Sequence, residues 1–281
     1  MGEAIDFDRR FGGVVRLYGE AGLAKLQAAH IVVVGIGGVG SWAAEALARN
    51  AVGTITLVDL DIISESNFNR QIHAVECNIG KDKILAMRER ILSINPTCQV
   101  RLIEDFVSLQ NASKMLDFHY DALLDCVDDA RAKTILASVC IAVKTPIIMS
   151  GSAGGRLDPT RIKTADLSAV TNDKLLAKVR NQLRRDYDFP KASNVKKSAK
   201  FGIICVYSDE PTLMPIEVCA LERNNDMVDD ALEANTRAAA GDAENPRAIT
   251  GLNCAGYGSS VCVTAPMGFT LAALAINLMI A

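Results

Sequence analysis

The sequence predicts an α/β protein in which helices cover a mostly parallel sheet. An apolar run, Ile31–Val34, leads directly into a glycine-rich turn, Gly35–Gly40. Strand-like and helix-like segments then alternate over residues 31–150, as parallel strands and their crossover helices do. Residues 156–281 add further apolar segments and an apolar tail. We therefore expect a Rossmann-like sheet with flanking helices, extended by further strands and a C-terminal helix.

Each element follows from its local pattern. Residues 1–30 predict an amphipathic leader helix with Leu17, Leu23 and Leu26 on one side. A helix follows Gly40, and a second strand ends at Asp59. The later elements of this half are a helix over 81–94 that stops before Asn95-Pro96, a strand within the apolar run 122–127, and a strand over 147–150.

The glycine pattern predicts a nucleotide site through backbone geometry. Gly35 permits a tight turn, Gly37 lets the main chain approach a phosphate, and Gly40 lets the helix pack on the strand. Asp59 stands at the end of the second strand, where a carboxylate typically binds ribose hydroxyls. A glycine motif alone is a weak signal, but the flanking strands, the helix and Asp59 together predict a Rossmann-type nucleotide site.

Charged residues further along favour ATP over a nicotinamide cofactor. Attack at the α-phosphate of ATP builds negative charge on the phosphoryl oxygens and on the leaving pyrophosphate, which fixed cations stabilise. Arg70 offers a planar fork to phosphate oxygens, and Lys83 offers a point charge. Asp128 follows a predicted strand at the sheet edge where such folds bind ligands, and it is placed to hold Mg²⁺.

These residues resemble those of the ubiquitin-activating-enzyme-like adenylyltransferases. Within that superfamily the chain is similar to the tRNA threonylcarbamoyladenosine dehydratases, densely to about residue 165 and more thinly beyond. The segments that carry the resemblance are Arg10-Phe11-Gly12-Gly13, Arg16-Leu17-Tyr18-Gly19, Gly37 to Arg49, Asn69-Arg70-Gln71-Ile72-His73-Ala74, Gly151-Ser152-Ala153-Gly154-Gly155 and Asp158-Pro159-Thr160.

The resemblance implies an activity and a site. Members of the family use ATP to adenylate the carboxylate of a threonylcarbamoyl group on an adenosine beside the tRNA anticodon, and loss of the adenylate closes a cyclic, dehydrated base. Arg70, Lys83 and Asp128 would be the catalytic residues, with Asp128 holding Mg²⁺. The implied ATP-binding positions are Gly35, Gly37, Gly38, Gly40, Asp59, Asp61, Ser66, Asn67, Asn69, Arg70, Lys83 and Asp128.

The family pattern also implies partners, and the sequence departs from that pattern in places. A homodimer is expected, and a sulfur-relay partner from a cysteine desulfurase system is an open possibility. Many relatives place an arginine that acts across the dimer where Gly13 stands here, and Arg16 is the nearest replacement. Asp129 stands where many relatives carry Asn or Ser, and it adds local negative charge.

A basic segment predicts contact with tRNA. The chain has a net charge of −3, but residues 156–200 carry twelve Lys and Arg against five acidic residues, a local excess of seven positive charges. Such a face supplies sequence-independent attraction to phosphates, and the alternative is a solvated amphipathic helix. The candidate tRNA contacts are Arg156, Arg180, Arg184, Arg185, Lys196 and Lys197.

Eight cysteines stand in the 281-residue chain, and no pair is spaced CxxC, so we expect no zinc site of the paired type. Cys205 has two interpretations: a thiol that accepts an activated group, or a packing residue in a strand. The first 20 residues are charged and lack the apolar core of a signal peptide. We therefore expect free thiols in a reducing cytoplasm.

The sequence suggests three regions within one continuous domain. They are a helical leader (1–30), an ATP-binding region (31–155), and a region for substrate binding and dimerisation (156–281) with an exposed, flexible loop around 222–250. The loop 151–155 is expected to be a hinge or binding loop, with carbonyls that could hold Na⁺ or K⁺, or a plain turn. The apolar tail 259–281 is long enough to span a membrane, but Pro266 and Gly268 favour a buried helix.

Two other functions remain open from sequence alone. The chain could adenylate the C-terminal glycine of a ubiquitin-like or sulfur-carrier protein, although the missing CxxC pairs and the basic segment argue against it. It could also be a non-catalytic scaffold of the same fold. The presence of Arg70, Lys83 and Asp128 in one chain argues against that alternative.

Overall fold

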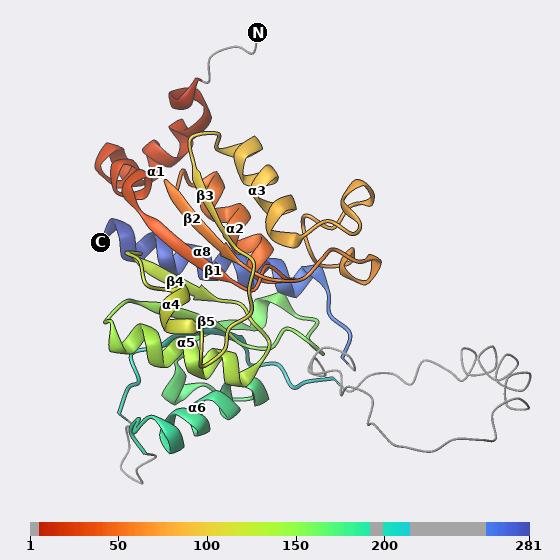
Figure 1. Cartoon of the computed structure of the whole chain (residues 1–281), viewed down its shortest axis with the longest axis vertical. Coiled ribbons are helices and arrows are strands. Elements are labelled where there is room, and N and C mark those ends of the chain that lie inside the picture. Colours follow the sequence, from red (N-terminus) through yellow and green to blue (C-terminus); the bar gives the residue numbers. More distant parts are fainter. Residues whose placement is uncertain (1–5, 192–198, 214–256) are drawn as a thin grey trace, which may run out of the picture.

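A single seven-stranded sheet runs through the protein, with the strand order β3-β2-β1-β4-β5-β7-β6 (Figure 1). This computed structural model describes residues 6–191, 199–213 and 257–281. The predicted loop around 222–250 and two predicted tRNA contacts, Lys196 and Lys197, lie outside the described residues. The strands are β1 (His30–Val34), β2 (Thr54–Val58), β3 (Gln99–Ile103), β4 (Ala122–Asp125), β5 (Ile147–Ser150), β6 (Ile162–Asp166) and β7 (Ile204–Ser208).

All neighbouring strands pair in parallel except β6, which runs antiparallel to β7 at one edge of the sheet. In the register of the sheet, Val34 of β1 lies level with Val58 of β2 and with Asp125 of β4. The chain therefore leaves these three neighbouring strands side by side, at Gly35, Asp59 and Cys126. The predicted mostly parallel α/β fold is confirmed.

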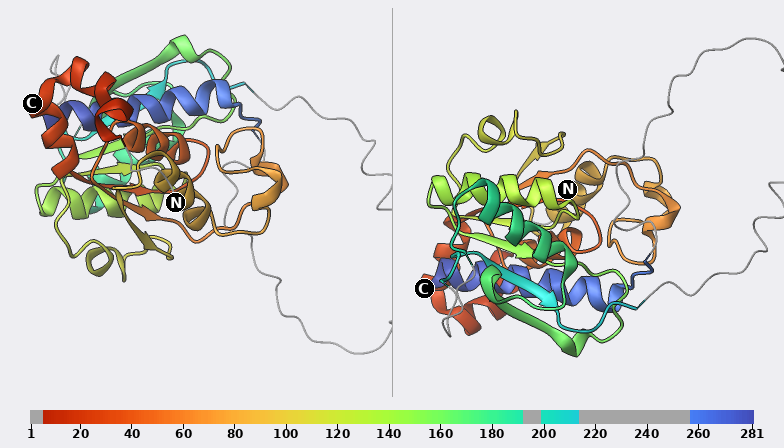
Figure 2. Two further views of the ribbon diagram at one scale, coloured as in Figure 1. Left: turned by 90° about the horizontal axis from the view of Figure 1, so that it is seen from above. Right: turned by 90° about the horizontal axis from the view of Figure 1, so that it is seen from below.

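Helices cover both faces of the sheet, as the two views in Figure 2 show. One face carries α1, α2, α3 and α8, and the other carries α4, α5 and α6. Their bounds are α1 (Phe7–Ala28), α2 (Gly40–Arg49), α3 (Lys83–Ile94), α4 (Ala112–Met115), α5 (Ala130–Ala142), α6 (Lys174–Asp186) and α8 (Val261–Ile280).

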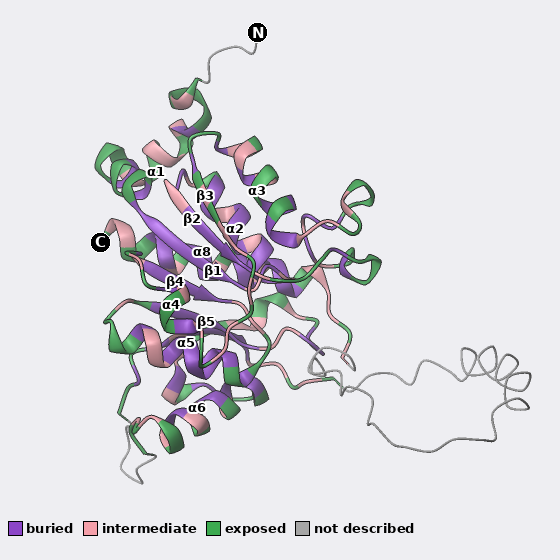
Figure 3. Ribbon diagram, in the orientation of Figure 1, coloured by how far each residue is buried: buried purple, intermediate pink, exposed green. Residues whose placement is uncertain are grey.

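Alternate residues of each central strand enter different cores. In β1, Ile31 and Val33 pack into the core below α2 and α8, whereas Val32 and Val34 pack into the core below α5 and α6. All five residues of β1 are buried, as expected for a parallel strand covered on both faces. Figure 3 shows the buried strands between helices whose outer sides are exposed.

The apolar tail forms the predicted C-terminal helix, α8, which packs against α2. The backbones come close, because a Cβ at Gly268 would lie 2.5 Å from the carbonyl oxygen of Val39. Met267, Leu271 and Ala275 are buried in the core, whereas Phe269 remains 45% exposed. Among the described residues, α8 alone is long and apolar enough to cross a bilayer, and half of its most apolar stretch is buried.

Two local predictions were wrong. Leu17 does not share the buried side of Leu23 and Leu26, since it is 71% exposed. The cause is Gly19, whose φ of 74° and ψ of 168° kink α1 and interrupt the helical repeat. The third helix starts at Lys83 rather than at residue 81, because residues 80–82 run beside Ile62 and Ile63 through backbone hydrogen bonds and an isolated bridge.

Candidate nucleotide-binding site

The glycine-rich turn after β1 packs against the turn after β4. Gly35 has a φ of +85°, in the left-handed region that favours glycine. A Cβ at Gly35 would lie 2.9 Å from the carbonyl carbon of Cys126, and a Cβ at Gly40 would lie 1.9 Å from the carbonyl oxygen of Gly35. Chain packing therefore requires glycine at both positions. Gly37 differs, because a Cβ there would have no contact within 4 Å, so space remains beside its backbone for a ligand.

Asp59 ties the end of β2 to this turn. Its Oδ2 accepts a hydrogen bond from the Ile36 backbone N–H at 2.6 Å, and its Oδ1 accepts one from the Asp61 N–H at 2.8 Å. A carboxylate oxygen has more than one acceptor site, so each oxygen can accept a further hydrogen bond. Asp59 thus has the placement and the remaining acceptor capacity that ribose hydroxyls need.

Lys83 begins α3 and turns back to the same edge of the sheet. Its Nζ donates to Asp61 Oδ2 at 2.6 Å, and the Lys83 backbone N–H donates to the Asp61 carbonyl oxygen at 3.0 Å. The Lys83 side chain is 8% exposed, whereas that of Asp61 is 73% exposed. The ammonium group is therefore held near the surface by a carboxylate that is itself open to solvent.

Arg70 also lies against the glycine-rich turn, at Gly38. Its aliphatic carbons would lie 3.2 Å from a Cβ at Gly38, and its Nη1 donates to the Ser66 carbonyl oxygen at 2.8 Å and to Asn69 Oδ1 at 3.0 Å. The indole of Trp42 in α2 donates to the Arg70 carbonyl oxygen at 2.9 Å. The position of Arg70 is thus fixed through both its backbone and its side chain.

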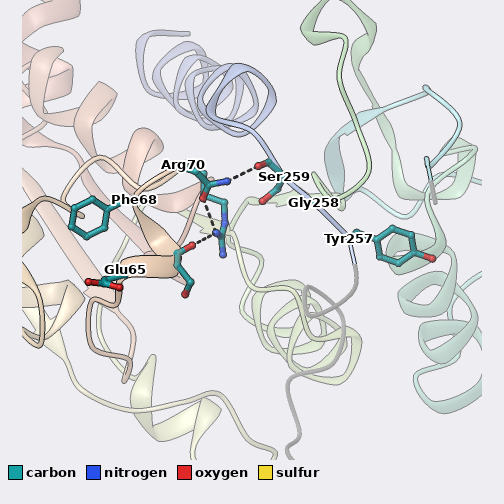
Figure 4. Close-up of a pocket in the computed structure, with 8 residues that line it drawn as sticks. Glu65, Phe68, Arg70, Tyr257, Gly258 and Ser259 are labelled. Atoms are coloured by element: carbon teal, nitrogen blue, oxygen red, sulfur yellow. Dashed lines mark hydrogen bonds between the residues drawn. The ribbon is translucent and has the colours of Figure 1, made fainter. Parts of the chain in front are cut away.

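A cavity of about 350 Å³ opens beside Arg70 (Figure 4). Figure 4 shows the arginine between the segment that begins at Glu65 and the chain at Gly258 and Ser259. Asn69 bridges the two sides, since its Nδ2 donates to the Ser259 carbonyl oxygen at 2.7 Å. The lining residues are Glu65, Ser66, Phe68, Asn69, Arg70, Tyr257, Gly258 and Ser259.

Asp128 stands on the turn between β4 and α5 with an exposed side chain. The preceding residues of this turn, Cys126 and Val127, contact Gly35. The adjacent Asp129 has a structural task, because its Oδ1 accepts the Ala132 N–H at 2.7 Å and caps α5. Among the described residues no group of three or more His, Cys, Asp or Glu forms a metal site. A single carboxylate is nevertheless enough for an ion that is also held by phosphates.

The loop 151–155 leaves β5 at the same edge of the sheet and is held at both ends. The Gly151 N–H donates to the Val206 carbonyl oxygen at 2.7 Å, and the Gly155 N–H donates to the Gly258 carbonyl oxygen at 2.8 Å. The Gly155 carbonyl oxygen in turn accepts from the Leu213 N–H at 2.9 Å. These bonds argue against a hinge and are compatible with both a binding loop and a plain turn.

Cys205 lies apart from this site, in the interior of the sheet. It belongs to β7 and is 0% exposed. Burial raises the pKa of its thiol well above the usual value. A thiol that accepts an activated group must form a thiolate and meet its substrate. The geometry therefore favours the packing interpretation of Cys205.

The basic segment is less exposed than its charge suggested. Arg156 is only 1% exposed, so its prediction as a surface contact for tRNA is wrong. Arg180 donates to the carbonyl oxygens of Leu167 and Val170, which holds α6 to the preceding turn. Arg184 donates to the Pro190 carbonyl oxygen, and Arg185 is exposed beside Asp186. The strongly exposed cations of α6 are Lys174, Lys178 and Arg185.

Two buried polar groups near the site were not predicted from the sequence. Asp125 at the end of β4 forms an ion pair with Lys133 of α5, with both side chains 0% exposed. His73 is 1% exposed, and burial, with the nearby charges of Lys83 and Arg90, lowers its pKa to about 4. An aspartate inside an apolar strand was a signal for the first group, but no sequence pattern marks Lys133 or His73 as buried.

The comparison with known protein families agrees with this geometry. The model described as the ThiF family matches residues 9–279. This chain belongs to the ThiF family. Among ThiF-like relatives, it is 40% identical to the tRNA threonylcarbamoyladenosine dehydratase of Escherichia coli (strain K12), over 97% of this chain and 94% of that protein. It is 41% identical to the Haemophilus influenzae protein of the same name, over 96% and 92% of the two chains.

Solved structures give the same result for this ThiF-family fold. The crystal structure of E. coli tRNA N6-threonylcarbamoyladenosine dehydratase in complex with ATP matches with a TM-score of 0.79 and 36% identity, covering 99% of this chain and 97% of that chain. The AMP complex of that enzyme matches with a TM-score of 0.81 and 37% identity, with the same coverage. Both the sequence and the fold therefore correspond over nearly the whole length.

Proposed function

We propose that this chain catalyses the ATP-dependent dehydration of N6-threonylcarbamoyladenosine in tRNA. One observation carries the proposal: over nearly its full length, the chain is similar to enzymes with this name, and one of them has been solved with ATP and with AMP. The glycine-rich turn, Asp59, Lys83 and Arg70 at one edge of the sheet support ATP as the co-substrate. The reaction begins by adenylation of the threonylcarbamoyl carboxylate and ends in ring closure.

The residues at the edge have distinct tasks. Gly37 leaves room for a phosphate, and Asp59 accepts hydrogen bonds from the ribose hydroxyls. When the carboxylate attacks the α-phosphate, a new O–P bond forms and the bond to pyrophosphate breaks. Arg70 and Lys83 stabilise the charge that grows on the phosphoryl and pyrophosphate oxygens. Ring closure then expels AMP, which carries away the oxygen that the base loses as water.

Asp128 is the residue that would hold Mg²⁺. Its exposed carboxylate fits an ion that takes one or two protein carboxylates together with the phosphates of ATP. The neighbouring carboxylate of Asp129 is engaged by the N-terminus of α5. When bound, the ion would neutralise phosphate charge.

The exposed side of α6 is the proposed surface for the tRNA backbone. Lys174, Lys178 and Arg185 are spaced so that they share one side of the helix, opposite the buried Leu176 and Leu183. The helix starts beside the loop 151–155, because Asp173 Oδ2 accepts the Ser152 N–H at 2.8 Å. The basic side therefore begins at the edge of the sheet where the nucleotide is expected.

The oligomeric state, the further partners and a monovalent cation stay predictions. A homodimer would bury apolar side chains that are exposed in the segment connecting β2 to α3, namely Ile62, Phe68, Val75 and Ile79. Light scattering of the purified protein tests it. The trans role of Arg16, the sulfur-relay partner, a monovalent cation at 151–155 and a cytoplasmic location also stay predictions.

Pyrophosphate release from ATP separates the proposed function from its alternatives. The purified protein is incubated with ATP, Mg²⁺ and either tRNA that contains threonylcarbamoyladenosine or a ubiquitin-like or sulfur-carrier protein with a C-terminal glycine. Release with tRNA alone supports the dehydratase. Release with the carrier protein alone supports the first alternative, and release with neither supports the non-catalytic scaffold.

A further inference from the structure

An ion pair lies buried beneath the turn that joins β4 to α5. Lys133 Nζ donates to Asp125 Oδ1 at 3.0 Å and to the Asp125 carbonyl oxygen at 3.2 Å. Both side chains are 0% exposed. Asp125 Oδ2 has no hydrogen-bond partner among the described residues. Burial raises the pKa of Asp125, and Lys133 acts in the opposite direction by favouring the charged form.

Stability alone does not account for such a pair. The desolvation of two buried charges offsets most of their attraction, and well-packed apolar residues of similar volume often stabilise a protein equally well or better. The unpartnered Oδ2 adds a further cost. The contacts of the pair with the β4–α5 turn indicate a different role.

Hydrogen bonds from the two side chains hold the first end of the turn and link it to α5. At the first end, Asp125 Oδ1 also accepts the Val127 backbone N–H at 3.2 Å. Lys133 Nζ, through its bond to the Asp125 carbonyl oxygen at 3.2 Å, joins this end of the turn to the first turn of α5. The Lys133 backbone N–H donates to the Asp129 carbonyl oxygen at 3.1 Å, a helical bond that does not depend on the side chain. The enclosed residues 126–129 include Asp128. The buried charges therefore sit where they restrain the backbone that carries the proposed Mg²⁺ ligand.

The same turn supports the glycine-rich loop. A Cβ at Gly35 would lie 2.9 Å from the carbonyl carbon and 3.0 Å from the carbonyl oxygen of Cys126, and 3.0 Å from the Val127 nitrogen. The Cβ of Cys126 would lie 3.1 Å from a Cβ at Gly40. Little space separates the β4–α5 turn from the Gly35–Gly40 loop. A shift of this turn therefore displaces the loop or changes the position of Asp128 relative to it.

We propose that Asp125 and Lys133 are positioning residues for ATP: their buried pair sets the β4–α5 turn and thereby fixes Asp128 relative to the Gly35–Gly40 loop. This inference rests on the proposed use of ATP but not on the identity of the acceptor. Partners that orient metal ligands typically change metal affinity or activity by about 10- to 100-fold when they are removed. We expect an effect on that scale.

The test replaces both charges together, with Asp125→Val and Lys133→Met, and measures ATP binding by calorimetry without tRNA. The thermal midpoint should stay at or above that of the wild type, because no lone charge is left buried. The Kd for ATP should rise roughly tenfold or more, and more Mg²⁺ should be needed for half-maximal binding. An unchanged Kd and Mg²⁺ requirement in a folded double variant would overturn the proposal.

A matched control uses a second pair with a buried carboxylate. Glu45 of α2 is 3% exposed, and its Oε2 accepts from Arg90 Nε at 2.6 Å, between α2 and α3. Its Oε1 also accepts from Arg49 Nε within α2 at 2.8 Å. Glu45→Gln with Arg90→Met should leave the Kd for ATP near that of the wild type. An equal loss of ATP binding in this control would show a general effect of removing ion pairs and would overturn the assignment.

If the double variant does not fold, hydrogen exchange in the wild-type protein provides the test. The Val127 amide, which donates to Asp125 Oδ1, should be protected without ATP about as strongly as the amides of β4. Exchange as fast as in an open loop would overturn the proposal, because the turn would then not be fixed before ATP binds. Because neither measurement uses tRNA, failure here is distinct from failure of the dehydratase assignment.

Discussion

At the scale of single residues, Arg70 and Lys83 carry the chemistry that we assign to the site. Arg70→Ala and Lys83→Ala should each lower the adenylation rate roughly 100-fold or more, the effect of removing one donor that stabilises a transition state. Steady-state pyrophosphate release measures this rate. Lys81→Ala is the control, because Lys81 pairs with Glu89 at the surface and such pairs contribute little. Near-normal rates in both site variants would remove the assigned role.

His73 gives a residue-scale prediction for stability. Burial is the main cause that lowers its folded pKa from 6.5 to about 4, with Lys83 and Arg90 adding to it. Between these values only the unfolded chain takes up the proton, so stability is lost as the pH falls through this window. Because of His73, the free energy of unfolding should fall by roughly 2 kcal/mol between about pH 7 and pH 5.

Denaturant unfolding at the two pH values measures this contribution. His73→Leu removes the titrating ring, so its stability should fall less on acidification than that of the wild type. The comparison with the wild type is essential because other groups also titrate. If the variant and the wild type lose the same stability, the imidazole is not held in its neutral form by burial.

The candidate site residues could be predicted from the sequence, but the burial of individual charged side chains could not. Asp59, Arg70 and Lys83 follow strand ends or a motif, and the structure brings them to one edge of the sheet. Arg156 and Lys133 carry charges that sequence patterns assign to the surface, yet both are buried. Their burial depends on which distant segments cover them, and a local pattern does not contain that information.

At the scale of elements, two glycines of the glycine-rich turn have different roles: Gly40 is needed for packing and Gly37 for ligand binding. Gly40→Ala should strongly destabilise the protein, since its Cβ would lie 1.9 Å from a backbone oxygen. Gly37→Ala should fold with a nearly normal thermal midpoint, since nothing lies within 4 Å of its Cβ, but it should weaken ATP binding. Thermal melting and calorimetry on both variants check this. Normal ATP binding by Gly37→Ala would place the phosphates elsewhere.

Helix α6 offers a prediction about tRNA. Lys178→Glu should weaken tRNA binding and reduce the slope of affinity against salt concentration, because one phosphate contact is lost. Filter binding over a range of salt concentrations measures both quantities. The control is Arg9→Glu, which makes the same charge change in α1, on the far side of the molecule from α6 (Figure 1). Equal effects of the two variants would leave only the overall charge as the cause.

Helices and strands marked by apolar runs or by a helix-ending motif were predictable from the sequence. Kinks and exact helix starts were less predictable. The strand over 147–150 and the end of α3 at Ile94 follow from apolar runs and from Asn95-Pro96. The kink at Gly19 was not predicted, because glycine in a helical pattern can also continue the helix. The start of α3 depends on the bridge between Ile62 and Asp82, a contact between segments distant in sequence.

At the scale of the whole molecule, both halves of the sequence contribute to one sheet and to the cores on its two faces. β7 pairs with β5, and α8 packs on α2, so the last segment of the chain covers the helix that follows the glycine-rich turn. The parallel class of the sheet was predictable from the alternation of strands and helices. The insertion of β7 between β5 and β6 was not predictable, because the sequence of an apolar strand does not indicate which strands it pairs with.

The central claim is that the ATP site acts on a modified adenosine in tRNA. The most direct measurement is the mass of that nucleoside after tRNA containing threonylcarbamoyladenosine has been incubated with the protein, ATP and Mg²⁺. We expect the loss of one water per modified base, dependent on ATP and strongly slowed by Arg70→Ala. An unchanged nucleoside mass, with a folded protein that still binds ATP, would contradict the proposed function.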